Sequence, residues 1–154
     1  MCAIQAEAVT GRPFAKAYVH SAMVGLDGEK MSKSKGNLVK VSQLLASGAD
    51  PMAVRLALLA HHYQTDWEWT AQGLEEAEAR LWLWTQAAHG TTSVDFTPAA
   101  QEVRAYLRNN LHAEGALPVI DRWAYESLDW ARDHPGARDD MAATADLLLG
   151  VAVA

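Results

Sequence analysis

The sequence predicts a fold of α+β to mainly α class, in which a short irregular segment precedes a bundle of helices. Residues 1–48 are rich in glycine and show no long helical period, whereas apolar residues recur at helical spacing from Asp50 onward. Half of the 154 residues are hydrophobic, so the chain can form a buried core, and extensive disorder is excluded. We therefore expect two domains, residues 1–48 and residues 49–154.

Local signals define the elements of the first domain. Thr10-Gly11-Arg12-Pro13 is a helix stop, and Asp27-Gly28 supplies the positive φ angles of a tight turn. Residues 30–37 are too polar for a core element and predict an exposed loop. In chain order we expect a helix ending near residue 8, a half-buried strand over 18–24, a turn at 26–29, the loop, and a short helix over 41–46.

The second domain is expected to be entirely helical. Asp50 is a typical N-cap with Pro51 at the first helical position, and Thr70 opens the next helix. Pro118 is expected in the first turn of a later helix, where proline is tolerated. The expected helices run from residue 51 toward 63, then over 71–88, 98–111, 116–133 and 138–149.

The charges are divided unevenly along the chain. All five lysines lie in residues 1–40, which carry six basic and three acidic residues; residues 41–154 carry seven basic and sixteen acidic ones. An acidic chain argues against broad nucleic-acid binding but leaves room for a small basic site. No apolar run is long enough to span a bilayer, the start does not resemble a signal peptide, and a single cysteine fits a reducing cytoplasm.

The segment Lys30-Met31-Ser32-Lys33-Ser34 carries the clearest chemical signal. Two ammonium groups three positions apart, with two hydroxyls and a nearby glycine, suit a polyphosphate, because lysines act as point charges and hydroxyls and loop amides donate to phosphate oxygens. From composition alone, a solvated connecting loop is the more common explanation, since no Walker-type glycine pattern accompanies it.

This string is the KMSKS signature of class I aminoacyl-tRNA synthetases and their relatives. Residues 6–15, 18–20, 26–37 and 50–63 together resemble the cysteinyl-tRNA synthetase group, and the resemblance covers residues 3 to about 88 well. It implies that residues 1–48 form the end of a Rossmann-type catalytic domain and that the helical bundle follows it.

Two branches of this group are candidates. Asp66-Trp67-Glu68-Trp69-Thr70 is similar to the cysteine ligases of mycothiol biosynthesis, and those ligases lack the anticodon-reading region of the synthetases. An acidic bundle also suits a tRNA-phosphate surface poorly. A fragment of a cysteinyl-tRNA synthetase and a non-catalytic helical module that retains the motif stay open as alternatives.

The resemblance also implies what this chain lacks. The HIGH motif, the zinc-binding cysteine and histidine residues, and the nucleotide-binding βαβ half of the group would all lie upstream. We therefore expect the chain to be the C-terminal part of a longer ATP-dependent ligase, inactive by itself, with no metal ligands of its own and with zinc bound by the missing part.

The resemblance assigns the site residues. Lys33, assisted by Lys30, is expected to act catalytically on the phosphates of ATP, and the set expected to bind ATP or the adenylate is Val24, Met31, Ser32, Lys33 and Ser34. The expected substrates are ATP, cysteine and glucosaminyl-inositol, without tRNA or membrane, and we expect a monomer.

Other candidates have simpler explanations. Cys2, His61 and His62 lack the spacing of a metal site, so the histidines are expected to pack or cap near a helix end. His20 is expected at an ordinary strand position, and a side chain directed toward the floor of the active site is the alternative. Glu75, Glu76 and Glu78 predict a solvated helix face. The six tryptophans, at 67, 69, 82, 84, 123 and 130, are expected to pack in the core.

Overall fold

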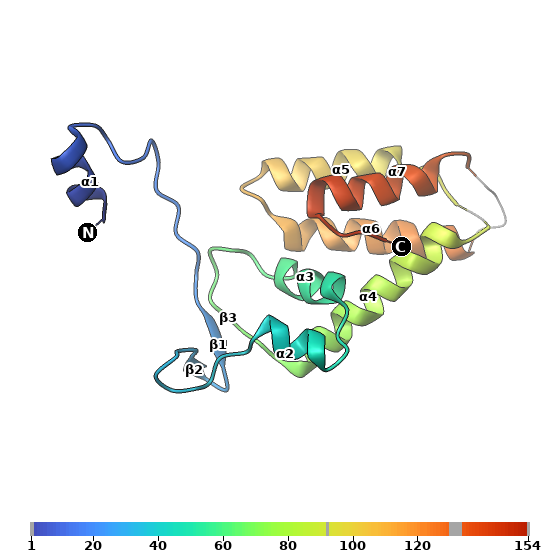
Figure 1. Ribbon diagram of the computed structural model, residues 1–154. Coiled ribbons are helices and arrows are strands. Elements are labelled where there is room, and N and C mark those ends of the chain that lie inside the picture. The colour runs from blue at the N-terminus through green and yellow to red at the C-terminus, as the bar shows by residue number, and fades with distance from the viewer. Residues whose placement is uncertain (1, 92, 130–133, 154) are drawn as a thin grey trace.

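A computed structural model describes residues 2–91, 93–129 and 134–153. The first helix, α1 (Cys2–Thr10), ends at Gly11, whose φ of +64° is the left-handed angle predicted for this stop. No residue of α1 is buried, and Figure 1 shows this helix apart from the other elements, joined to them by an extended segment. Ile4, Val9, Phe14 and Val19 are therefore apolar side chains exposed to solvent.

Three short strands follow: β1 (Val24–Leu26), β2 (Glu29–Lys30) and β3 (Trp67–Glu68), in the order β2-β1-β3. Leu26 pairs with Glu29 in the antiparallel hairpin, and Val24 pairs with Trp67 in parallel. The hairpin turn is at Asp27 and Gly28, with φ angles of 54° and 77°, as predicted.

The prediction of a strand over residues 18–24 was wrong for most of its length. β1 begins only at Val24, and Tyr18, Val19 and His20 are exposed on the extended segment. Pairing with the segment before β3 starts at Ala22, whose N–H donates to the Tyr63 carbonyl at 2.8 Å. A strand needs a neighbouring strand for its hydrogen bonds, and the sequence pattern of residues 18–21 could not reveal where that neighbour begins.

The next three helices begin where the sequence predicted, two of them at predicted capping residues. Helix α2 spans Val41–Ala46, α3 spans Pro51–Leu59 and α4 spans Ala71–His89. The Asp50 carboxylate accepts from the Met52 N–H at 2.7 Å, and the Thr70 hydroxyl accepts from the Gly73 N–H at 3.0 Å. The exposed Glu75, Glu76 and Glu78 form the expected solvated face of α4.

Helices α5 (Thr97–Arg108) and α6 (Ala113–Asp129) meet at a junction that the sequence misplaced. Helix α5 ends three residues early because Asn110 and Leu111 adopt φ angles of 56° and 54°. Helix α6 begins at Ala113, so Pro118 lies inside the helix instead of in its first turn, and its ring removes one helical hydrogen bond. The predicted continuation of this helix over residues 130–133 lies outside the described residues.

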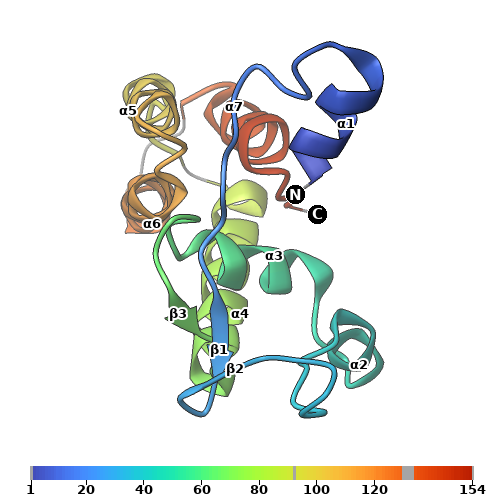
Figure 2. The same cartoon turned by 90° about the vertical axis from the view of Figure 1, so that its left-hand side faces the viewer.

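The bundle ends with α7 (Ala137–Thr144) and a π-helical turn, η1 (Ala145–Leu149). This end contacts the first bundle helix, since Arg55 Nε of α3 donates to the Leu149 carbonyl. Gly150, with φ of +64°, passes so close that a Cβ atom there would lie 2.5 Å from the Arg55 guanidinium. Figures 1 and 2 show α3, α4, α5, α6 and α7 gathered into one bundle.

The largest core side chains come from each of these helices and from the α4–α5 connection. They are Leu56, Trp84, Phe96, Val103, Leu117, Ile120, Trp123, Met141 and Leu149. The prediction that the tryptophans pack in the core is confirmed for Trp84 and Trp123, while Trp67 and Trp69 are half-buried. It was wrong for Trp82, which is 64 % exposed, and Trp130 lies outside the described residues. In the described part of the chain, no helix combines the length and apolar character needed to cross a membrane.

Candidate functional site

The motif loop, residues 30–37, leaves the β1–β2 hairpin and leads toward α2. Its tip is a turn over residues 33–36, where Lys33 and Ser34 are exposed, while Met31 and Ser32 are half-buried. Neither Lys30 nor Lys33 forms an ion pair with any residue that the structure describes. The two cations are therefore open to an anion from solvent.

Hydrogen bonds within the loop fix its shape. The Ser32 N–H donates to Asn37 Oδ1 at 2.9 Å, and Asn37 Nδ2 donates to the Lys30 carbonyl at 3.3 Å. The Ser32 hydroxyl accepts from the Lys35 N–H at 3.3 Å and lies 3.2 Å from the Ser34 hydroxyl. Both hydroxyls of the motif thus lie side by side at the turn.

Lys35 differs from the two motif lysines. Its Nζ lies 2.8 Å from Glu29 Oε2, in an ion pair that spans the base of the loop. Both side chains are more than half exposed, so solvent screens the pair and its contribution to stability is small. Glu29 and Asn37 were not identified as site residues from the sequence; the signal that could have found Asn37 is an amide side chain directly after a glycine turn.

Val24 lies on the same hairpin as the motif loop, but it lines a cleft that contains no residue of that loop. It lines an apolar cleft of about 440 Å³ together with His61, Trp67 and leucines of α3, α5 and η1. The Met23 N–H beside it donates to Asp66 Oδ1 at 2.7 Å, which fixes the backbone where β1 begins. The structure therefore joins Val24 and the motif lysines through one hairpin.

His61 and His62 follow α3, which ends at Leu59, so the expected continuation of that helix toward residue 63 was wrong. The His61 ring stacks on Trp67 with centroids 3.9 Å apart, which confirms the packing role. Burial lowers the pKa of His61, and the Glu114 carboxylate only partly opposes this.

His62 and Tyr63 hold the junction between α5 and α6. His62 Nε2 lies 3.2 Å from the Asn110 carbonyl oxygen, and the Tyr63 hydroxyl donates to Asn110 Oδ1 at 2.8 Å. These contacts tie the segment that follows α3 to the turn between α5 and α6.

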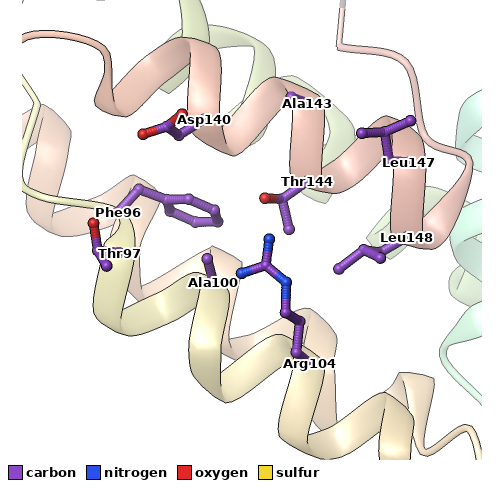
Figure 3. A pocket seen from close by; sticks show the side chains of 9 residues that line it. All are labelled: Phe96, Thr97, Ala100, Arg104, Asp140, Ala143, Thr144, Leu147 and Leu148. Atoms are coloured by element: carbon purple, nitrogen blue, oxygen red, sulfur yellow. The ribbon is translucent and has the colours of Figure 1, made fainter.

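A second hollow lies within the bundle, between α5 and the α7–η1 segment. It has a volume of about 290 Å³, and Figure 3 shows Arg104, Thr144 and Leu148 among the side chains that line it. None of the predicted site residues lines this hollow. It is therefore separate from the motif loop.

The residues that the structure describes offer no ligand cluster for a zinc ion. No group of three or more histidine, cysteine, aspartate or glutamate side chains is arranged among them to hold a metal. The described residues therefore do not fit a zinc site.

Comparison with known proteins shows the family to which the chain belongs. Residues 2–79 match the family model of the tRNA synthetases class I (C) catalytic domain, and the chain belongs to this family. The matched range runs from α1 through the motif loop and α3 into α4.

The most similar relatives include three proteins named L-cysteine:1D-myo-inositol 2-amino-2-deoxy-alpha-D-glucopyranoside ligase. Those of Thermomonospora curvata, Thermobifida fusca and Streptomyces coelicolor are 54 %, 53 % and 51 % identical to this chain. Each match covers 99 % of this chain but only 37 %, 37 % and 38 % of the relative. The chain therefore spans little more than a third of the length of these ligases.

Proposed function

We propose that this chain supplies the phosphate-binding loop and helical bundle of an ATP-dependent cysteine ligase that works in the cytoplasm. The ligase activates cysteine as cysteinyl-adenylate and joins it to the amine of glucosaminyl-inositol, a step of mycothiol biosynthesis. The observation that carries the proposal is the pair of exposed cations, Lys30 and Lys33, on a hydrogen-bonded loop of a chain more than half identical to named ligases.

The proposed chemistry has two steps. A carboxylate oxygen of cysteine attacks the α-phosphorus of ATP, the bond to the β-phosphate oxygen breaks, and pyrophosphate leaves. The amine of glucosaminyl-inositol then attacks the adenylate carbonyl, AMP leaves, and the amine loses a proton. Negative charge grows on the departing pyrophosphate oxygens in the first step, so cations held there stabilise the transition state more than bound ATP.

The residues of this chain act in the first step. Lys33, at the exposed tip, is the cation assigned to the departing phosphates, and Lys30, at the loop base, assists it. The hydroxyls of Ser32 and Ser34, 3.2 Å apart, are proposed to donate to phosphate oxygens when ATP is bound. Met31, Ser32 and the backbone of Val24 are assigned to the adenosine side.

A cysteinyl-tRNA synthetase fragment is the second candidate, because the matching family model is that of a tRNA synthetase catalytic domain. The acidic bundle favours the ligase. Residues 41–154 hold sixteen acidic and seven basic residues, and a surface that binds tRNA phosphates needs positive charge.

A chimera tests the proposal. In the Thermobifida fusca ligase, the segment aligned with this chain is replaced by residues 1–154, and cysteine-dependent exchange of labelled pyrophosphate into ATP is measured. We expect exchange, followed by ligation when glucosaminyl-inositol is added and no aminoacylation when tRNA is added. A folded chimera that exchanges pyrophosphate and charges tRNA would support the synthetase instead. A folded chimera without exchange would support the non-catalytic module.

A further inference from the structure

Asn37 lies at the end of the motif loop, outside the five-residue motif itself. Its half-buried carboxamide bonds to the backbone on both sides of Met31: Oδ1 accepts from the Ser32 N–H at 2.9 Å, and Nδ2 donates to the Lys30 carbonyl at 3.3 Å. We propose that Asn37 is the positioning residue of this loop, which holds Lys30 and Lys33 ready for a polyphosphate. This inference rests on the proposed function.

The two hydrogen bonds need one acceptor and one donor on the same short side chain. Asparagine provides both, whereas aspartate offers two acceptors, and the amide of glutamine is one carbon further from the backbone. An acceptor and a donor placed side by side fix both the direction and the position of the Lys30–Ser32 backbone. The geometry therefore specifies an asparagine at this position.

The rest of the loop depends on this fixed base. The Ser32 hydroxyl accepts from the Lys35 N–H, and the Lys33 carbonyl accepts from the Gly36 N–H at 3.2 Å, with φ of +71° at Gly36. Because Ser32 contributes to both the base and the tip, displacing its backbone also displaces the turn that carries Lys33. A loop ordered before the ligand arrives loses less conformational entropy on binding.

The charges around the loop also support a positioning role for Asn37. Glu29 pairs with Lys35, so the carboxylate at the loop base is occupied by a lysine outside the motif. Lys30 and Lys33 keep their charge available, and Asn37 is neutral, so it orders the loop without competing with phosphate for these cations.

The experiment compares the 154-residue chain with Asn37→Ala, Asn37→Asp, Lys33→Ala and the control Gln43→Ala. Gln43 is an exposed amide on α2 whose side chain makes no hydrogen bond to the described residues. Amide hydrogen exchange at Ser32 and backbone order at residues 33–35 are measured by NMR without ligand. Binding of inorganic tripolyphosphate and the thermal unfolding midpoint are measured on the same samples.

For Asn37→Ala we expect Ser32 exchange about five- to tenfold faster, lower order at residues 33–35, and tripolyphosphate binding weakened about fivefold, as loss of a hydrogen bond implies. The unfolding midpoint should stay unchanged, since the bundle core is elsewhere. Asn37→Asp keeps the acceptor, so Ser32 exchange should stay close to that of the parent. Gln43→Ala should match the parent in every measurement.

The results can contradict this proposal and the proposed function separately. Ser32 exchange or tripolyphosphate affinity unchanged in Asn37→Ala would overturn the role of Asn37. Parental affinity in Lys33→Ala would count against the proposed function instead, whatever Asn37 does. A parent chain that does not bind tripolyphosphate would overturn both.

Discussion

Replacing Asp121 by alanine should destabilise the bundle strongly, because one carboxylate holds two groups of α4. Asp121 Oδ1 accepts from Trp84 Nε1 at 2.8 Å, and both carboxylate oxygens lie 3.0 Å from Arg80 Nε. Trp84 is fully buried, and the side chains of Arg80 and Asp121 are only 24 % and 20 % exposed.

The size of the effect follows from these contacts. A buried indole N–H left without a partner costs about 1–3 kcal/mol, and loss of the charged hydrogen bond to Arg80 adds about 1 kcal/mol after allowance for partial solvent exposure. We expect Asp121→Ala to lower the free energy of unfolding by about 3 kcal/mol, measured by urea denaturation with an unchanged m-value.

A matched ion pair gives the control. Glu102 pairs with Arg122 at 2.6 Å, but these side chains are 41 % and 57 % exposed, so Glu102→Ala should cost less than about 0.5 kcal/mol. In a Trp84→Phe background, the unpaired N–H no longer exists, and Asp121→Ala should cost about 1–2 kcal/mol less. The reasoning is refuted if Asp121→Ala costs no more than Glu102→Ala, or if the Trp84→Phe background leaves its cost unchanged.

Four further predictions follow from the site and the caps. In the chimeric ligase, Lys33→Ala should slow pyrophosphate exchange at least about 100-fold without lowering the unfolding midpoint; a rate within about twofold of the parent would exclude Lys33 from phosphate contact. The chain alone should give no cysteine-dependent pyrophosphate exchange, so clear exchange would contradict the need for the rest of the ligase. Asp50→Ala should cost about 1 kcal/mol in urea unfolding through loss of the α3 cap, and a cost near zero would show that the cap is dispensable. The pKa of His61 is lowered in the folded chain, so its contribution to stability is present above the unfolded value of 6.5 and is lost as the pH falls through the folded value. In His61→Phe, which keeps a ring on Trp67, the difference in unfolding free energy between pH 7.5 and pH 5 should therefore shrink. An unchanged difference would assign the pH dependence to other groups.

The sequence predicted the elements whose ends are set locally. Asp50, Thr70 and the Asp27-Gly28 turn act through bonds or angles within three residues, so their effect can be inferred from neighbouring residues alone. The exposed motif loop was likewise predicted from its local composition and placed correctly.

The remaining differences depend on contacts between distant parts of the chain. The α5–α6 junction is held by the Tyr63 hydroxyl, which donates to Asn110, 47 residues later in the sequence. β1 begins directly after Met23, whose N–H donates to the Asp66 carboxylate. Asn37 directly follows Gly36, but which backbone groups its amide would hold, those of Lys30 and Ser32, depends on how the whole loop folds back. Trp82 was predicted to pack in the core because it is a large apolar side chain, but it lies on the solvent-exposed side of α4.

The contact between Arg55 and the turn at Leu149 has a consequence for how the bundle loses structure. It joins residues 94 positions apart, and Val151, just beyond, is fully buried. The end of the bundle is therefore tied to α3, and we expect the two segments to lose structure together. Amide protons of η1, although close to the end of the chain, should exchange through the same global opening as those of α3.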